Sequence, residues 1–376
     1  MPLMTFLTQC FFDNGALARL PKVLAGLGVT KPFIVTDPGL RDVGLLDRVT
    51  EALGQPAAGL FAETLANPIQ WQAEEASEAY RASGADGLIA LGGGSAMDMA
   101  KAVGLRVSHD QPWSTYAARL GGSKKIGKIP PLVAIPTTAG TGSEVSVGAI
   151  VILEDGTKET FISQNLIPAA AICDPELTLG LPPGLTAATG MDAVTHCIEA
   201  VLSPLVNPPC EGIGYDGVHR AVGQGWLKRA VADGSDLEAR WHMMMASYEG
   251  ALAFVKGLGG VHALSHAAGR LHEKKLHHGT LNAIFLPHLL RANAGTADEK
   301  YARLRFAMGL PEAGDLADAI ERLNQDIGIP ARLSQIGLAA EDGPAVVEYA
   351  LIDLAHQSNA RPLEASDYER IYEAAL

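Results

Sequence analysis

The sequence predicts an α/β domain at residues 1–183 followed by an all-helical domain at residues 184–376. In the first half, short apolar runs alternate with amphipathic stretches, which is the pattern of a mostly parallel sheet with helices on its faces. From Thr186 onward, strand-like runs disappear and helical stretches follow one another. The change falls near residues 179–190, LGLPPGLTAATG, where two prolines and three glycines interrupt the chain.

Four apolar runs of the first half are predicted strands, because each is short, buried in character and followed by a polar or glycine-rich turn. They are residues 32–36, 87–91, 132–136 and 170–173. Residues 69–84 lie between the first two strands and have helical spacing, with Gly84 as the C-terminal stop. In the second half, the clearest predicted helices are residues 191–202, 236–257 and 315–328.

The composition excludes several classes of protein. Of the 376 residues, 48% are hydrophobic and 19% are charged, which is typical of a packed globular protein. The net charge of −13, with no basic tail, argues against electrostatic binding to nucleic acid or to an anionic membrane. No apolar run is long enough to span a bilayer, and no pair of the four cysteines forms a CxxC motif. These features lead us to expect a cytoplasmic protein.

A glycine-rich segment, LGGGSAMDMAK at residues 91–101, follows a predicted strand and opens a predicted helix. Gly93 and Gly94 would let a ligand approach the backbone, and the free N–H groups at the helix start suit a pyrophosphate. Ser95 and Asp98 have the spacing of a capping box. Because Met97 stands where a third glycine would be needed, the segment is not a standard dinucleotide fingerprint, and a purely structural turn is the alternative.

A second loop, IPTTAGTGSEVS at residues 135–146, follows another predicted strand. Its hydroxyl groups would lie at the C-terminal edge of a parallel sheet, where such sheets bind ligands, so two loops together favour a nucleotide. The hydroxyl-bearing candidates are Thr137, Thr138, Thr141 and Ser143. Asp37, at the end of the first predicted strand, could accept hydrogen bonds from a ribose, which favours NAD(H) over NADP(H). The alternative for Asp37 is a cap for the helix that begins at Pro38.

Histidines and a carboxylate recur at helical spacing. Asp192 and His196 are four residues apart, as are His262 and His266, so each pair lies on one helix face. Five of the eleven histidines fall within residues 262–278. This predicts a metal site with nitrogen and oxygen ligands, which suits Fe(II), Zn(II), Mn(II), Co(II) or Ni(II). A zinc protease is disfavoured because Ala263 replaces the glutamate of an HExxH motif.

Several long segments in this order resemble the iron-containing (group III) alcohol dehydrogenase family. They are GGGSAMDMAK, PTTAGTGSEVS, GMDAVTHCIEA and GLGGVHALSHAAG followed by HHGTLNAIFLP, and the resemblance runs from about Phe33 to the C-terminus. It implies a dehydroquinate synthase-like architecture, with a Rossmann-like nucleotide-binding domain, a helical metal-binding domain and an active site in the cleft between them. It also implies a homodimer or larger homo-oligomer.

The resemblance implies a role for individual residues. The metal, Fe(II) or alternatively Zn(II), would be held by Asp192, His196, His262 and His278, with His277 competing for the last position. His266 would be a catalytic proton carrier beside Asp192 and His262. For NAD(H), the resemblance points to Asp37, Asn67, Gly93, Gly94, Ser95, Asp98, Thr137, Thr138, Thr141 and Ser143, with Lys158 and Leu177 nearby.

Within the family, the chain looks closest to bacterial 4-hydroxybutyrate dehydrogenases, which interconvert 4-hydroxybutyrate and succinate semialdehyde by hydride transfer with NAD(H). About two extra residues precede HHG, and the inserted stretch is basic; with Lys256, the side chain of Arg270 is a candidate for binding a substrate carboxylate. A solvated basic loop is the alternative, above all for Lys274 and Lys275. The alternative functions are dehydrogenation of another small primary alcohol or diol, of the lactaldehyde or propanediol type, a maleylacetate reductase, and a dehydroquinate synthase-type lyase.

Overall fold

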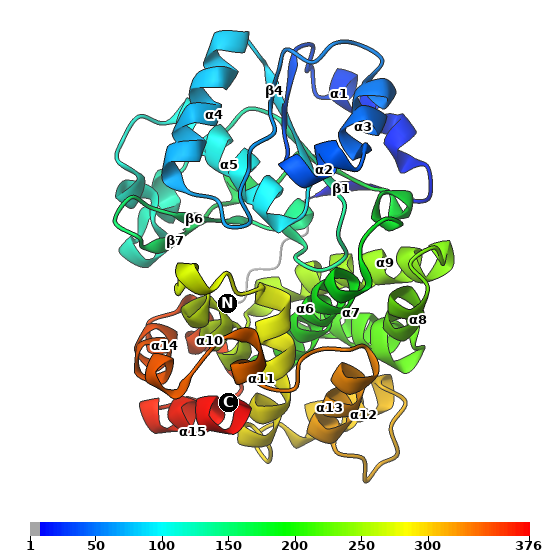
Figure 1. The fold of residues 1–376 in the computed structure, drawn as a ribbon, viewed down its shortest axis with the longest axis vertical. Coiled ribbons are helices and arrows are strands. Elements are labelled where there is room, and N and C mark those ends of the chain that lie inside the picture. The colour runs from blue at the N-terminus through cyan, green and yellow to red at the C-terminus, as the bar shows by residue number, and fades with distance from the viewer. Residues whose placement is uncertain (1–7) are drawn as a thin grey trace. The chain divides into compact units, whose positions relative to one another are not determined.

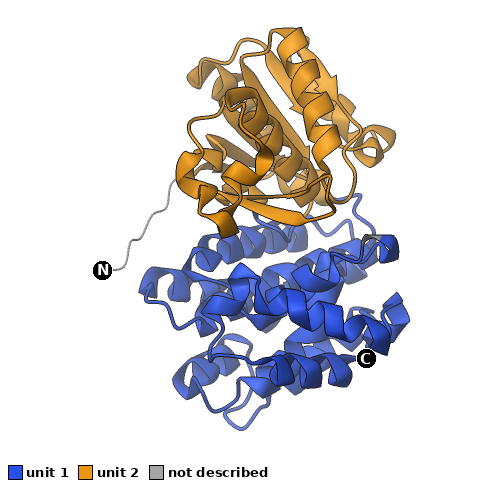
Figure 2. Ribbon diagram, turned by 90° about the vertical axis from the view of Figure 1, so that its left-hand side faces the viewer, with its two compact units in different colours: residues 1–5, 139–142, 179–376 blue, residues 6–138, 143–178 orange. Residues whose placement is uncertain are grey.

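A computed structural model describes residues 8–376, which form two compact units (Figures 1 and 2). The α/β unit consists of the described residues up to Thr138 together with residues 143–178, and is orange in Figure 2. The helical unit consists of residues 139–142 and 179–376, and is blue. The short segment 139–142 therefore leaves the α/β unit and packs with the helices.

The α/β unit is built on a six-stranded sheet with the strand order β1-β8-β5-β4-β2-β3, in which all neighbours are parallel. The strands are β1 (Gln9–Phe12), β2 (Pro32–Val35), β3 (Gly59–Phe61), β4 (Gly87–Gly92), β5 (Leu132–Pro136) and β8 (Ala170–Cys173). The four predicted strands are confirmed as β2, β4, β5 and β8. The outer strands β1 and β3 are additional.

Helices cover both faces of this sheet, as its buried strands require. The helices of the unit are α1 (Leu20–Gly26), α2 (Pro38–Asp42), α3 (Leu45–Leu53), α4 (Gln70–Ser83) and α5 (Gly94–Ser108). Along β2, Phe33 and Val35 pack into the cluster formed with α4 and α5, whereas Ile34 packs into the cluster formed with α1 and α3. The alternation places one hydrophobic core on each face.

A two-stranded antiparallel hairpin follows the hydroxyl-rich loop. It consists of β6 (Gly148–Ile152) and β7 (Lys158–Ile162), and Gly156 adopts a left-handed conformation (φ 79°) in the turn. This hairpin is not among the predicted elements, although Asp155-Gly156 between two apolar runs is a strong hairpin signal.

The helical unit contains ten α-helices and, among its described residues, no strand. They are α6 (Pro183–Leu202), α7 (Pro208–Val218), α8 (Trp226–Ala232), α9 (Leu237–Ala253), α10 (Gly260–Ala268), α11 (His278–Ala292), α12 (Asp298–Ala307), α13 (Leu316–Asp326), α14 (Gly343–Leu351) and α15 (Ala365–Ala375). Helix α6 is buried along almost its whole length, as expected for a central helix. Its neighbours include α7, α9 and α11.

The predicted helices are confirmed as α4, α6, α9 and α13, and their ends follow the expected capping rules. Gly84 ends α4 in a left-handed conformation. Asp236 and Asp315 precede α9 and α13, and their carboxylates accept hydrogen bonds from the backbone N–H groups of Ala239 and Asp318. Among residues 8–376, no helix combines the length and apolar character that a membrane span requires.

Helices α6 and α11 approach closely at a glycine. A Cβ atom at Gly279 would lie 2.1 Å from the carbonyl oxygen of Ala188 and 3.3 Å from the Cβ of Asp192. Only glycine therefore allows the first turn of α11 to lie against α6 at this point.

We predict that Gly279→Ala lowers the free energy of unfolding by about 1 to 3 kcal/mol, because the added methyl group forces two packed helices apart. Urea denaturation would measure the change. Gly212→Ala is the matched control, since Gly212 is an exposed helical glycine with nothing within 4 Å of the added Cβ; this variant should be unchanged or slightly more stable. Equal stability of both variants would contradict the close packing.

Candidate metal centre and nucleotide loop

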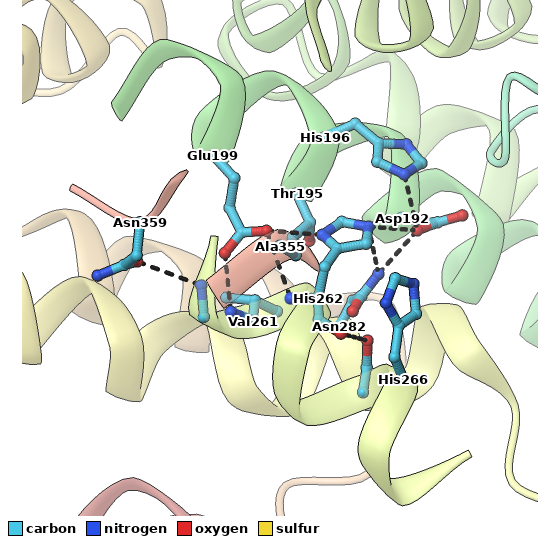
Figure 3. Close-up of polar contacts among 12 residues, drawn as sticks. Asp192, Thr195, His196, Glu199, Val261, His262, His266, Asn282, Ala355 and Asn359 are labelled. Atoms are coloured by element: carbon cyan, nitrogen blue, oxygen red, sulfur yellow. Dashed lines mark hydrogen bonds and ion pairs between the residues drawn. The ribbon is translucent and has the colours of Figure 1, made fainter. Parts of the chain in front are cut away.

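Three helices of the helical unit bring the predicted metal ligands together. Asp192 and His196 lie one turn apart on α6, His262 lies in the first turn of α10, and His278 is the first residue of α11. Figure 3 shows Asp192, His196 and His262 converging. Asp192, His196 and His262 are all buried. The i,i+4 spacing on α6 places two of the predicted ligands, and the packing of α11 against α6 places His278. The start of α10, where the N–H of Val261 donates to Glu199 on α6, places His262.

One carboxylate oxygen is the common point of this cluster. Asp192 Oδ1 lies 3.6 Å from His196 Nε2, 3.7 Å from His262 Nε2 and 3.6 Å from His278 Nε2. These separations exceed a normal hydrogen bond, but they are close to the roughly 3.4 Å between neighbouring ligand atoms in a tetrahedral site with bonds of about 2.1 Å. The donor set therefore fits a small divalent cation.

The electrostatics of the cluster keep Asp192 ionised. Burial favours the neutral acid, but the three surrounding histidines hold the pKa of Asp192 well below its usual range. Burial lowers the pKa of His196 to about 4. Burial also opposes protonation of His262, yet the neighbouring carboxylates of Asp192 and Glu199 raise its pKa to about 9. The carboxylate and the neutral His196 are thus already in the protonation states that a metal ligand needs.

An amide side chain lies among the ligand atoms. Asn282 Nδ2 donates to Asp192 Oδ1 at 2.8 Å and lies 3.2 Å from His278 Nε2 and 3.3 Å from His262 Nε2. The Asn282 Oδ1 atom is buried, and no hydrogen-bond donor among the described residues reaches it. A fully buried carbonyl without a partner is unusual, and it again marks this cluster as a place built for a further group.

Two carboxylates that are not among the predicted site residues contact histidines of the cluster. Each lies against the Nδ1 atom of its histidine. Glu199 Oε2 lies 2.6 Å from His262 Nδ1, and Asp353 Oδ2 lies 3.1 Å from His266 Nδ1. Burial opposes ionisation of Asp353, but the neighbouring His266 lowers its pKa. Helical spacing could have identified Glu199, which follows Asp192 by seven residues. Asp353 has no such signal, because it lies far from His266 in the sequence.

In the α/β unit, the glycine-rich segment forms the predicted turn into a helix, but the capping box is wrong. Helix α5 begins at Gly94, and no side chain caps it. Ser95 instead donates to the carbonyl oxygen of Ala66. The Asp98 carboxylate accepts from Ser143 Oγ at 2.8 Å and from the N–H of Ile150 at 3.0 Å. The N-terminal N–H groups of α5 are therefore not occupied by these side chains, and Asp98 connects the two predicted cofactor loops.

A buried lysine organises the second loop. The Lys101 side chain on α5 is fully buried, and its Nζ lies between 2.7 and 3.3 Å from five oxygen atoms. These atoms are the carbonyl and hydroxyl oxygens of Ser143 and Ser146 and the carbonyl oxygen of Gly148. Burial lowers the pKa of Lys101 to about 8, while Asp98 and Glu144 oppose that shift.

Both halves of the chain match models of known protein families. Residues 8–175 match the model of iron-containing alcohol dehydrogenases, and residues 186–376 match the model of the C-terminal part of the Fe-containing alcohol dehydrogenase family. Together these matches cover nearly the whole chain.

The chain belongs to the iron-containing alcohol dehydrogenase family.

Individual members of the family resemble the chain over its full length. It is 45% identical over 384 residues to 4-hydroxybutyrate dehydrogenase of Cupriavidus necator, with 100% of each chain covered. A solved 1,3-propanediol oxidoreductase has a TM-score of 0.93 and 33% identity, again with 100% of each chain covered. Sulfoacetaldehyde reductase from Bifidobacterium kashiwanohense, solved in complex with NAD+, has a TM-score of 0.89 and 26% identity, covering 100% of this chain and 98% of that one. The protein is therefore an alcohol oxidoreductase with the dehydroquinate synthase-like fold that the resemblance implies.

The two histidines before Gly279 lie in different places. His277 is exposed and precedes α11, and its Nδ1 lies 3.5 Å from Thr280 Oγ1. His278 is half-buried and presents Nε2 to Asp192. Of the two histidines that compete for the fourth ligand position of an iron-containing alcohol dehydrogenase, His278 has the geometry of a ligand.

The placement of Lys256 does not fit a carboxylate-binding role. Its side chain is fully buried. The Nζ atom donates to the carbonyl oxygens of Ala200 at 2.9 Å, Val201 at 3.3 Å and Ser203, and lies 3.2 Å from Glu211 Oε1. Its charge therefore stabilises the C-terminal end of α6, where carbonyl groups lack helical partners, and we do not retain it as a substrate residue.

The other basic candidates lie nearer the surface. The Arg270 guanidinium lies 4.4 Å from the ring centre of Tyr349, and the side chain is half-buried. Lys274 donates to the carbonyl oxygen of Gly337 and pairs with Asp342. Lys275 is exposed.

The remaining cofactor candidates are spread over the sheet edge and its loops. Asp37 caps α2 by accepting from the N–H of Leu40, so the capping alternative is what the structure contains. Lys158 Nζ donates to Asn67 Oδ1 at 3.3 Å. The other candidates are Thr137, which is buried, Thr138, which lies beside Gly93, Thr141, in the segment that packs with the helices, and Leu177, in the core against α1 and α3.

We predict that Lys101→Met lowers the free energy of unfolding by about 3 kcal/mol or more, because several buried oxygen acceptors lose their donor. Chemical denaturation would measure the loss, and hydrogen exchange should show faster exchange in residues 143–150. Lys125→Met is the control, since Lys125 is exposed and should change little. If the two variants were equally stable, the organising role of Lys101 would be excluded.

Proposed function

We propose that the protein is a metal- and NAD(H)-dependent dehydrogenase that interconverts 4-hydroxybutyrate and succinate semialdehyde. The observation that carries the proposal is the convergence of three imidazole nitrogens on one oxygen of Asp192. The full-length identity of 45% to a 4-hydroxybutyrate dehydrogenase supports the substrate.

The metal would be held by Asp192, His196, His262 and His278, and we propose Fe(II) as the physiological ion, with Zn(II) as the alternative. One carboxylate and three imidazoles suit both ions. When bound, the metal supplies a Lewis acid for the substrate oxygen, and NAD(H) accepts or supplies the hydride. The protein contributes a largely buried set of donor atoms that the fold already brings together.

We propose that NAD(H) binds at the start of α5 and along the second loop. The backbone N–H groups at Gly94 and Ser95 suit a pyrophosphate, since Ser95 and Asp98 do not cap the helix. The further candidates are Asp37, Asn67, Gly93, Thr137, Thr138, Thr141, Ser143 and Lys158. The contacts of Asp98 and Leu177 support a structural role, since Asp98 accepts a hydrogen bond from Ser143 of the second loop and Leu177 lies in the core.

His266 is the proposed proton carrier between the alcohol oxygen and solvent. Asp353 accepts a hydrogen bond from its Nδ1, which leaves Nε2 as the nitrogen that exchanges a proton. The His266 ring stacks on that of His278, with centroids 5.3 Å apart and planes inclined by 14°. A ring beside a proposed metal ligand, held by a carboxylate and partly exposed, suits proton transfer at the site.

The substrate carboxylate would be bound by Arg270, which follows the helix that carries His262 and His266. A guanidinium can bind a carboxylate through two parallel hydrogen bonds. Two relatives support an anionic aldehyde substrate, since the names of both a 4-hydroxybutyrate dehydrogenase and a sulfoacetaldehyde reductase specify an acidic group.

We further propose that the protein is cytoplasmic and forms a homodimer or a larger homo-oligomer. All four cysteines are free thiols, which agrees with a reducing compartment.

With Fe(II) or Zn(II) and NADH, we predict that kcat/KM for succinate semialdehyde exceeds that for butanal at least about 10-fold, corresponding to about 1.4 kcal/mol. The carboxylate is the chemical difference between the two aldehydes. Absorbance of NADH measures both rates, and a chelator should abolish them. If butanal were reduced equally fast or faster, the proposed acidic substrate would be wrong, and the protein would be an alcohol dehydrogenase that acts on an uncharged substrate.

The same assay tests the proposed carboxylate ligand. Arg270→Met should reduce kcat/KM for succinate semialdehyde while leaving that for butanal nearly unchanged. Lys275→Met is the control, because Lys275 is an exposed cation of the same insert. If Lys275→Met removed the preference and Arg270→Met did not, the assignment of Arg270 would be wrong.

His278→Ala should reduce metal content and turnover together, whereas His277→Ala should retain both. The reason is that His278, and not His277, presents a nitrogen to Asp192. Elemental analysis after metal loading and desalting would measure occupancy. Loss of the metal only in His277→Ala would assign the fourth ligand to the other histidine.

A further inference from the structure

Glu199 is a buried carboxylate on the face of α6 that also carries Asp192 and His196. The three residues are spaced by four and three positions, so they follow one another along one side of the helix. Glu199 is 3% exposed. Figure 3 shows it on the side of His262 opposite Asp192.

The carboxylate contacts His262 through the nitrogen that faces away from the proposed metal. Glu199 Oε2 lies 2.6 Å from His262 Nδ1, while His262 Nε2 points to Asp192 Oδ1. A carboxylate can only accept a hydrogen bond at this place, so it fixes the proton of a neutral imidazole on Nδ1. The lone pair of the ring is then on Nε2, where a metal would bind.

Backbone groups hold the carboxylate in turn. Glu199 Oε1 accepts from the N–H of Val261 at 2.8 Å, and Oε2 lies 3.4 Å from the N–H of His262. Space for Oε1 comes from Gly259, where a Cβ atom would lie 2.7 Å away. The Glu199 side chain therefore holds both the backbone at the start of α10 and the ring of His262.

We propose that Glu199 is a positioning residue of the metal centre: through His262 Nδ1, it fixes the tautomer and orientation of that ligand and so increases the affinity for the metal. The inference rests on the metal site of the proposed function. Its negative charge also balances the bound ion, since Asp192 and Glu199 together match the charge of a divalent cation.

The alternative is that Glu199 only stabilises the start of α10, and the chain offers a matched control for this. Asn359 Oδ1 accepts from the N–H of Gly260 at 3.2 Å, in the same first turn, without contacting His262 (Figure 3). Asn359→Ala therefore weakens the helix start and leaves the imidazole contact intact. Glu199→Gln keeps the size of the side chain. Its oxygen must face the N–H of Val261, so its amide N–H faces His262 Nδ1 and favours the wrong tautomer.

The test is the affinity of the metal-free protein for Zn(II), measured by competition with a chromophoric chelator. Wild type should bind one ion, Glu199→Gln should bind about 10- to 100-fold more weakly, and Asn359→Ala should bind as wild type, although both variants melt at a lower temperature. With Co(II), only Glu199→Gln should change the visible absorption bands of the bound ion.

The outcomes separate the two proposals. If wild type binds no metal, the proposed function and this inference both fail. If wild type binds metal but Glu199→Gln binds equally well, or Asn359→Ala loses as much affinity, only the inference fails. Because Glu199→Gln could fail to fold, NMR of zinc-loaded wild type gives a second measurement of the His262 Nδ1 proton: a strongly downfield signal protected from exchange with water, as expected for a hydrogen bond to a carboxylate, supports the inference, and a freely exchanging proton overturns it.

Discussion

A carboxylate buried inside a helical bundle is the constraint around which the helical unit is arranged. Asp192 lies on α6, which is enclosed along nearly its whole length, and an isolated buried charge is strongly destabilising. The unit compensates by directing three imidazoles and one amide at the same carboxylate. These contacts bring the first turns of α10 and α11 to the same carboxylate of α6. Glycines 259 and 279 allow the close approaches that the arrangement requires.

Much of the fold follows from local sequence patterns. The four inner strands are short apolar runs with clear turns, and Gly84, Asp236 and Asp315 mark helix ends that the structure contains. The outer strands β1 and β3 are less visible in the sequence, because each lies at an edge of the sheet and is only partly buried, whereas the equally short β2 and β8 are fully buried apolar runs. The hairpin of β6 and β7 is different, because the turn residues Asp155-Gly156 are themselves a sequence signal for it.

Helical spacing predicts only those residues of the candidate site that lie on the same helix. Helical spacing joins Asp192 to His196, and the same rule extended by one turn reaches Glu199. It cannot show that the start of α10 and the first turn of α11 meet this face, whereas the resemblance of the motifs implies it. Lys256 shows the opposite case, in which sequence reveals a charge but not its burial. The ammonium is enclosed by carbonyl oxygens at a helix end, a partner that leaves no trace in the side-chain sequence.

Lys101 behaves like an internal monovalent cation, coordinated by oxygens from a short stretch of loop. A loop rich in glycine, serine and threonine would otherwise sample many conformations, and a ligand would have to select one of them. Because Lys101 binds these oxygens in the folded chain, residues 143–148 lose their conformational entropy during folding and not when a ligand binds. Any ligand of that surface meets a template of fixed shape, and its affinity is not reduced by the ordering of the loop.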